Sequence, residues 1–462
     1  MAALGLAVVF VLAACTSGHR SGGGPSSTAR ASASTSAPPG GAAAVRVGVW
    51  EQPDVAAPTV GGGAVRALVL PQLFVVQPDG SWAPSLVQPG SVHDGAGFRS
   101  ASFRLRRGAV WSNGAPITAA DLKRSADQRF VAGIDGPARD GTVTVRFTQP
   151  LPGWRRLWSG LDAVSAPAPG VWGGPFVLAG STPGLDVVLR RNPRWYGRPL
   201  ASIAELRLVL VPDAVTARQL LQRGALDVVM PPAGTNRTPQ LRGLPGVSVD
   251  VAAPGGWWVG LLLNPARLST DARRALVATV DRAPFVAVLL RDEAVLATGF
   301  TGPRDRTWAA VGAGDASKLR NKTVDLVAEN EEPLIVPLER SMQKRARPAG
   351  GTLSLRDAEA DRVDSWVAER AYDAAVVELL DPPGECWTCR WGFVDAGLAR
   401  AADAGDRSAI VALESRLRDD AFVLPLWRPL TVVAWRNGIT GVKANPYAAS
   451  AAWNAWEWQR HG

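Results

Sequence analysis

The feature that most constrains the fold of this chain is a capped helix followed directly by an apolar strand, in "PDAVTARQLLQRGALDVVM" (212–230). Asp213 can cap this helix, and the apolar positions 214, 217, 220 and 221 share one of its faces. Gly224 can end the helix in the left-handed conformation, and the buried strand "ALDVVM" follows at once. This segment therefore predicts one helix–strand unit of a larger sheet.

The same alternation continues along the chain. Segments 268–290 and 406–427 are predicted to be further units of this kind. A helix is predicted over 117–130, with Thr118 as N-cap and Asp121 three residues on, which is the capping-box spacing. Strands are predicted at 45–50, 102–106, 142–148, 185–191 and 205–211. Helices interleaved with strands over 462 residues, 47% of them hydrophobic, predict an α/β protein with enough apolar area for more than one lobe.

The N-terminal residues differ from the rest of the chain. Residues 1–14 form an apolar run that is typical of a signal peptide and too short to span a bilayer. Since no basic segment precedes this run, we expect the true start codon to lie upstream. Leu12-Ala13-Ala14-Cys15 resembles a bacterial lipobox, which predicts cleavage before Cys15 and a diacylglycerol on its thiol; a buried cysteine in an apolar helix is the alternative. The Ser-, Gly-, Ala- and Pro-rich stretch that follows favours the anchor, so residues 15–44 are predicted to be a lipidated cysteine and a disordered tether.

The basic charge of the chain does not predict a nucleic-acid partner. The formal net charge is +9, and almost all of the cations are arginines, with only five lysines. The arginines are scattered and form no stripe along one segment, which argues against a nucleic-acid interface. Weak attraction to anionic lipid headgroups remains an open alternative.

Several segments resemble one family of extracellular proteins. The stretch "SFRLRRGAVWSNGAPITAADLKRS" (102–125) resembles the signature of the extracellular solute-binding proteins of family 5, which serve oligopeptide and dipeptide ABC importers. Its Asn113-Gly114 turn and Thr118 cap are interpreted as scaffold rather than as a site. Later landmarks of the family are matched, in order, within 173–197, 213–227, 258–282, 372–377 and 423–427.

The resemblance implies a two-lobed α/β fold like that of type II periplasmic binding proteins, with mixed sheets and a ligand cleft between the lobes. Residues 45–250 together with 436–462 would form lobe one, including an inserted subdomain, and residues 251–435 would form lobe two. It also implies a lipid-anchored receptor on the extracytoplasmic face of the cell membrane. Such a receptor captures peptides or other small solutes by hinge closure and presents them to an ABC permease. We expect a monomer without cofactor or metal.

Candidate ligand-binding residues follow from the same resemblance. Relatives offer backbone groups just before the first helix, bind extended peptides along the main chain, and often hold the ligand's ammonium with an aspartate. Asp381 is the nearest acidic match, with a turn residue before Pro382-Pro383 as the alternative. For Trp257 and Trp258, at the expected lobe crossing, the alternative is a packed hinge core. The full set of candidates is Thr59, Val60, Trp257, Trp258, Asp381, Trp387 and Trp391.

The pair Cys386 and Cys389 is predicted to form a local disulfide that stiffens a loop bordering the cleft. A zinc site would need four ligands, and the chain has three histidines, at 19, 93 and 461, and no second Cys-x-x-Cys. A thioredoxin-like redox site is the other alternative. A disulfide fits an extracytoplasmic location, although it would close a very small loop.

We expect no enzymatic activity. The chain contains no Gly-x-Ser-x-Gly, Walker or His-Glu-x-x-His motif. "SMQK" (341–344) matches the Ser-x-x-Lys pattern of penicillin-binding proteins, but neither partner motif follows it. The chain is short for the family between about 290 and 400, which keeps a second hypothesis open. That hypothesis is a transport-inactive lipoprotein of the same fold that regulates cell-envelope assembly through a protein partner.

Overall fold

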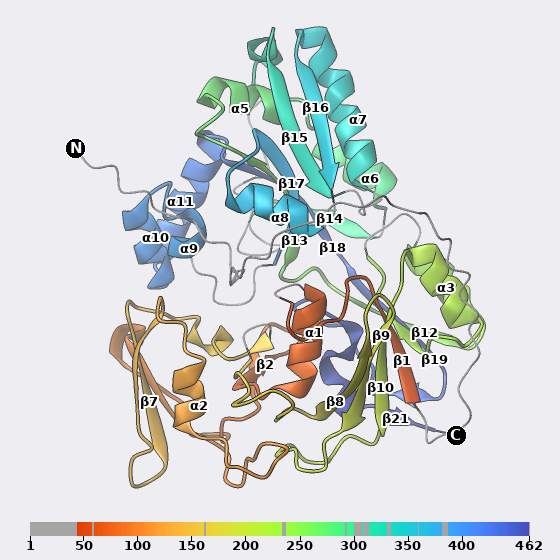
Figure 1. Ribbon diagram of the computed structural model, residues 1–462. Helices are drawn as coiled ribbons and strands as arrows, with labels where there is room; N and C mark the ends of the chain where they lie inside the picture. The colour runs from red at the N-terminus through yellow and green to blue at the C-terminus, as the bar shows by residue number, and fades with distance from the viewer. Residues whose placement is uncertain are drawn as a thin grey trace, which may run out of the picture.

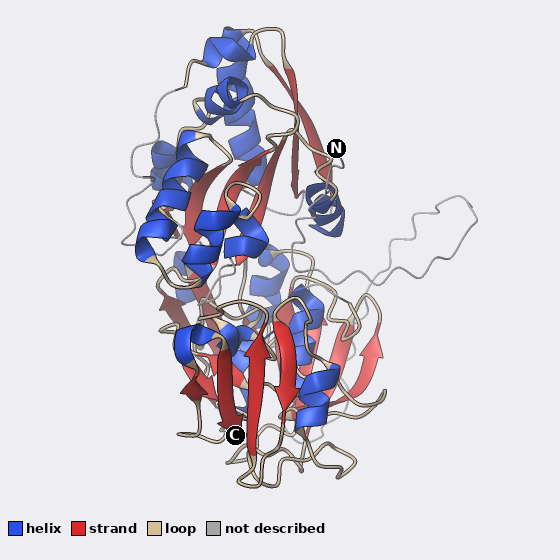
Figure 2. Ribbon diagram, turned by 90° about the vertical axis from the view of Figure 1, so that its left-hand side faces the viewer, coloured by secondary structure: helices blue, strands red, loops and turns tan. Residues whose placement is uncertain are grey.

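The computed structural model describes residues 44–57, 60–160, 163–232, 237–291, 293–299, 308, 314–329, 334–358, 360–380 and 387–461, without the side chains of 360, 361, 364, 380, 389 and 390. The elements fall into two lobes, which lie one above the other in Figures 1 and 2. Lobe one contains a seven-stranded and a four-stranded sheet, and lobe two contains a six-stranded sheet.

The seven-stranded sheet is mixed. Its central strand β1 pairs parallel with β10 and β11, and the other described pairings are antiparallel. In spatial order its strands are β12 (Val247–Ala252), β19 (Thr431–Arg436), β11 (Val228–Val229), β1 (Ala44–Val49), β10 (Glu205–Leu210), β9 (Asp186–Arg191) and β8 (Phe176–Thr182).

Both faces of this sheet are covered. Helix α1 (Val60–Val69) and the 3-10 segment η6 (Ala451–Glu457) supply the core on one face. Helices α3 (Ala214–Gln222) and α4 (Arg237–Arg242) supply a separate core on the other. Because both faces are buried, β1 reads as a nearly continuous apolar run rather than as an alternating one.

The six-stranded sheet of lobe two is also mixed. Its strands β15, β16 and β17 run parallel, whereas β13 is antiparallel to both of its neighbours. In spatial order they are β14 (Ala294–Leu296), β18 (Val423–Pro429), β13 (Trp257–Leu263), β17 (Ala374–Leu380), β15 (Thr323–Glu329) and β16 (Thr352–Ala358). The helices of lobe two are α5 (Thr270–Val277), α6 (Arg282–Leu289), α7 (Ile335–Ala346), α8 (Ala360–Ala368), α9 (Trp387–Trp391), α10 (Ala396–Asp403) and α11 (Arg407–Asp419), with 3-10 turns η4 (Ala316–Leu319) and η5 (Arg347–Ala349).

The four-stranded sheet forms a subdomain of lobe one with its own apolar core. Trp154 lies at the centre of this core, fully buried, and its ring stacks on Phe103 at 5.8 Å between centroids. The strands are β4 (His93–Asp94), β5 (Ser100–Arg104), β7 (Thr142–Phe147) and β6 (Val131–Asp135), followed by η2 (Trp154–Arg156). Smaller elements complete the lobe: η1 (Ala96–Phe98), α2 (Ala119–Arg124), and two two-stranded sheets, β2 (Phe74–Val76) with β3 (Trp82–Pro84) and β20 (Ile439–Thr440) with β21 (Gln459–Arg460).

The local predictions at the helix ends are confirmed. The Asp213 carboxylate accepts a hydrogen bond from the Thr216 amide at 2.7 Å, and Gly224 adopts a positive φ of 72°. The Thr118 amide donates to Asp121 Oδ2 at 2.7 Å, as the capping-box spacing predicts. These ends form as predicted because a cap needs only residues three or four positions apart.

Two predicted elements are wrong in extent. The helix predicted over 117–130 ends at Arg124, and Phe130 lies in a turn before β6. In 268–290, the apolar run after Asp281 is helix α6 rather than a strand. Pro284 lies in the first turn of α6, where a missing amide hydrogen costs nothing, whereas inside a central strand it would remove a ladder hydrogen bond.

Candidate functional site

The two lobes are joined where the chain passes from β12 to β13 and from β18 to β19. Arg428, at the end of β18, is 2% exposed and links these two passages. Its Nη1 donates to Gly255 O at 2.9 Å in the first passage, and its Nη2 donates to Gly299 O at 2.9 Å. The buried guanidinium of Arg428 therefore links the second connection to the first and to the segment after β14.

A buried ion pair lies beside the second passage. Arg237, at the start of α4, donates from Nε to Glu293 Oε2 at 2.9 Å, and the two side chains are 6% and 0% exposed. Arg237 also donates from Nη2 to Leu430 O at 2.8 Å. The Glu293 carboxylate accepts a second bond from the Thr238 amide at 2.6 Å. The charge of Glu293 is therefore neutralised by a residue of the other lobe.

A second contact joins the lobes at another edge, between the four-stranded subdomain and α10. Gln149 Nε2 lies 3.4 Å from Asp403 Oδ2. The same carboxylate accepts bonds from the amides of Trp387, at 2.6 Å, and Thr388, at 3.1 Å, and from the Thr388 hydroxyl. Burial raises the pKa of Asp403, and the bonds from Thr388 and Trp387 act in the opposite direction. Asp403 therefore accepts hydrogen bonds at the start of α9 and also contacts Gln149 of lobe one.

Hydrogen bonds join residues 51–57 to the first two turns of α1, the helix that begins at the candidate Val60. The Gly61 amide donates to Glu51 Oε2 at 2.8 Å, and Arg66 Nη1 donates to the carbonyls of Val55 and Ala57. A Cβ on Gly62 would lie 2.2 Å from Ala57 O, so the loop packs directly against the helix backbone. Thr59, the other candidate here, lies outside the described residues.

The candidate tryptophans lie in different surroundings. Trp258, Trp387 and Trp391 belong to the apolar core of lobe two, at 0%, 5% and 4% exposure. Trp257 is half-buried, and it points to the opposite face of β13 from Trp258 because side chains alternate along a strand. Trp257 therefore offers a ligand more surface than the other three tryptophans.

The remaining candidate residues lie outside the described part of the chain. Cys15, Asp381 and Cys386 lie outside the described residues, as does the side chain of Cys389. Within the described ranges, no cluster of three or more His, Cys, Asp or Glu side chains has the arrangement of a metal site. In those same ranges no helix combines the length and the apolar character that crossing a bilayer requires.

The side chains that join the lobes were not predictable from the sequence. Gln149 and Asp403 are 254 positions apart, and Arg237 and Glu293 are 56 apart. No local spacing pairs such residues, because each pair meets only when separate elements pack. The local sequence carried no signal for either residue of the ion pair, because Asn236 and Thr238 flank Arg237 and the charged Asp292 precedes Glu293.

Comparison with solved structures finds the same fold. The periplasmic EDTA-binding protein EppA has a TM-score of 0.76 and 19% sequence identity, over 91% of this chain and 97% of that one. The oligopeptide-binding protein AppA from Bacillus subtilis, in complex with a nonapeptide, has a TM-score of 0.76 and 14% identity, over 91% and 99%. The binding protein MoaA from A. tumefaciens R10, in complex with mannopinic acid, has a TM-score of 0.77 and 17% identity, over 91% and 99%.

These neighbours are two-lobed periplasmic binding proteins, so the fold class expected from the sequence is confirmed. No curated protein matches the chain. The family model described as bacterial extracellular solute-binding proteins, family 5 Middle, matches residues 96–329, just over half of the chain. The resemblance seen in the sequence is thereby confirmed, and the chain belongs to the bacterial extracellular solute-binding proteins of family 5.

Proposed function

We propose that the protein is a lipid-anchored receptor that captures peptide-like solutes outside the cell and presents them to the permease of an ABC importer. Cys15 would carry the anchor, and the receptor would act as a monomer. Family membership supports a solute-binding role without a catalytic step. AppA, bound to a nonapeptide, and a dipeptide-binding protein bound to Met-Leu support peptides as the ligand class.

Capture would work by closure of the lobes. The observation that carries this proposal is the pair of contacts between the lobes: a buried ion pair beside the chain passages, and the Gln149–Asp403 contact at another edge. A ligand that touches both lobes shifts the population toward the closed form by its differential affinity for that form. We propose lobe boundaries at 252/253 and 430/431, whereas the sequence placed them at 250/251 and 435/436, because β12 and β19 pair with each other along their whole length in the sheet of lobe one.

The ligand would lie between the loop before α1 and the start of β13. In this arrangement Thr59 and Val60 would offer backbone groups, Trp257 an aromatic wall, and Asp381 the counter-charge for an ammonium group. Trp258, Trp387 and Trp391 would support the site from the core. A disulfide between Cys386 and Cys389 would stiffen the loop that carries Asp381.

A thermal-shift screen of the purified protein with di- to nonapeptides tests this proposal. A binding peptide at a hundred times its Kd should stabilise the fold by about 2.7 kcal/mol, because ligand binds only the folded state. Trp257→Ala should weaken that peptide about tenfold through loss of an aromatic contact. Trp453→Ala, half-buried in lobe one at η6, is the matched control and should leave affinity unchanged.

If no peptide or other small solute raises the melting temperature, the transport role is excluded and the alternative of a regulator with a protein partner gains support. Mass spectrometry of the mature N-terminus tests the anchor separately. A protein that still carries residues 1–14 and no acyl group would contradict it.

A further inference from the structure

The end of lobe two farthest from lobe one gathers two segments that are distant in sequence. Residues 314–322 precede β15 and residues 340–351 precede β16, and these strands run parallel, so both segments meet at the same end of the sheet (Figure 1). The Asn321 amide donates to Gly350 O, and the Thr352 amide donates to Lys322 O, each at 2.9 Å. The loop after α5 adjoins them.

This end of the lobe is strongly basic. We call it the basic pole, defined by six exposed cations: Lys318, Arg320, Lys322, Lys344, Arg345 and Arg347. The chain has five lysines, and three of them lie here. In segments 278–281, 314–322 and 340–352 the only carboxylates are Asp281 and Asp315. Among the described residues, Arg345 alone of the six has an ion-pair partner, Asp281 at 2.5 Å.

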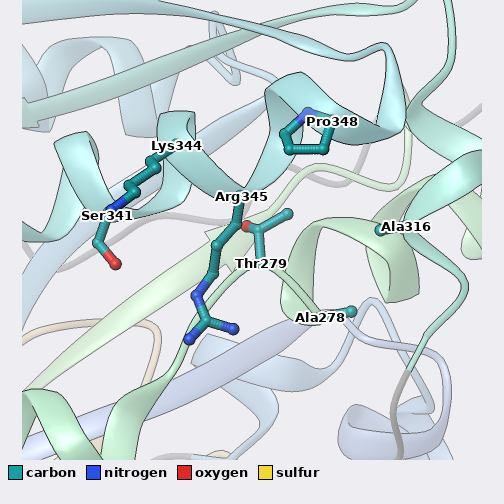
Figure 3. A pocket seen from close by; sticks show the side chains of 7 residues that line it. All are labelled: Ala278, Thr279, Ala316, Ser341, Lys344, Arg345 and Pro348. Carbon is teal, nitrogen blue, oxygen red and sulfur yellow. The ribbon is translucent and has the colours of Figure 1, made fainter.

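A cavity of about 520 Å³ opens within the basic pole. It is lined by Ala278, Thr279, Ala316, Ser341, Lys344, Arg345 and Pro348 (Figure 3). That volume lies within the roughly 300–1,000 Å³ of pockets that hold small molecules. Ser341 and Lys344 share one face of α7, because residues three apart on a helix are neighbours.

The chemistry of the lining favours binding over catalysis. A serine nucleophile needs a base within hydrogen-bond reach. In the described part of the chain, no hydrogen bond joins Ser341 Oγ to Lys344 Nζ. A hydroxyl, an ammonium and a guanidinium around one cavity are instead the donors that hold phosphate oxygens.

We propose that the basic pole is a binding site for a soluble anion with two or more phosphate groups, seated in the cavity beside Ser341, Lys344 and Arg345. The other cations of the basic pole add a positive potential around the cavity. An anion with several phosphate groups interacts with more of this potential than a single phosphate does. A concave seat fits a small anion better than a flat lipid surface.

Isothermal titration calorimetry with sodium tripolyphosphate tests the proposal on the purified chain. Lys344→Ala should weaken binding tenfold or more, and Ser341→Ala about threefold, because a charge-assisted hydrogen bond contributes more than a neutral one. Lys123→Ala is the matched control, because Lys123 is likewise an exposed lysine in the last turn of a helix, α2. Binding should also weaken as salt is raised.

Three outcomes would overturn the proposal. The first is no binding of tripolyphosphate at near-physiological salt. The second is equal loss in Lys344→Ala and Lys123→Ala, which would show general charge attraction. The third is binding to phosphatidylglycerol vesicles, relative to phosphatidylcholine vesicles, without binding of tripolyphosphate, which would make the basic pole a membrane contact. Inorganic phosphate should bind more weakly than tripolyphosphate if several cations act together.

Discussion

At the scale of single residues, Glu339 links the stability of the fold to pH. Its side chain lies on α7, is 1% exposed, and its Oε1 has no hydrogen-bond partner among the described residues. Burial raises the pKa of Glu339 to about 8, and the nearby Asp357 carboxylate on β16 adds to the rise. The folded protein therefore keeps a proton at neutral pH that the unfolded chain releases.

Glu339→Gln should stabilise the protein increasingly as pH rises. The ordinary pKa of a glutamate is near 4.5, so both states of the wild type are protonated below that pH and the substitution has little effect. Between about 4.5 and 8 the unfolded wild type loses its proton and the folded wild type does not, so wild-type stability falls. The variant should therefore gain roughly 1–3 kcal/mol over the wild type at pH 8.

Urea unfolding of both proteins at pH 5 and pH 8 measures this difference. Glu369→Gln, which removes an exposed carboxylate of the same lobe, should show no such trend. A gain for Glu339→Gln that is equal at the two pH values would contradict the ionisation argument.

At the scale of elements, helix ends in this protein are capped both locally and from a distance. Asp395 and Asp406 cap α10 and α11 by accepting bonds from amides two and three residues on. Helix α9 is different, because Asp403 at the end of α10 accepts from its first amides. Since Asp403 also contacts Gln149, the start of α9 and the position of lobe one depend on the same carboxylate.

Gln149→Ala should shift the lobes toward a more open arrangement without disturbing α9. One hydrogen bond of 0.5–1.5 kcal/mol corresponds to a change of about 2- to 10-fold in the open-to-closed ratio. Distances between spin labels on the two lobes, measured by pulsed electron paramagnetic resonance, report this ratio. Gln222→Ala on α3 is the control. Identical distance distributions in wild type and Gln149→Ala would show that the contact does not influence closure.

At the scale of the whole molecule, the two lobes share a buried ion pair near the passages of the chain. Arg237 and Glu293 come from different lobes, and both are almost fully removed from water. Burying two charges costs free energy because both leave water, and the attraction between them offsets part of that cost. When one of the two charges is removed, the other stays buried without that attraction, so the net cost rises. The Arg237–Glu293 pair thus makes the folding of each lobe depend on the presence of the other.

Glu293→Gln should therefore lower the free energy of unfolding by about 3–5 kcal/mol, because it removes the carboxylate charge that faces the buried Arg237 guanidinium. The double variant Arg237→Met, Glu293→Gln should recover part of that loss, because the buried guanidinium is removed as well. Calorimetry would show whether the lobes unfold together. A double variant that is less stable than Glu293→Gln alone would mean that Arg237 acts through its carbonyl contacts rather than through its charge.

The sequence by itself determined the α/β class, the family and many of the local elements. Capped helices at Asp213 and Asp406 and strands such as 142–148 were predictable, because caps and strand patterns depend on residues a few positions apart. The family was recognisable because segments such as 102–125 build the scaffold itself.

Only the tertiary structure decided which distant side chains meet. It placed Trp258 in the core and left Trp257 half-buried, and it joined Gln149 to Asp403 and Arg237 to Glu293. It also decided that the apolar run after Asp281 is a helix and that β19 belongs to the first sheet. The physical reason is that burial and charge pairing depend on how elements from distant parts of the chain pack. A short stretch of sequence does not determine which distant elements it will contact.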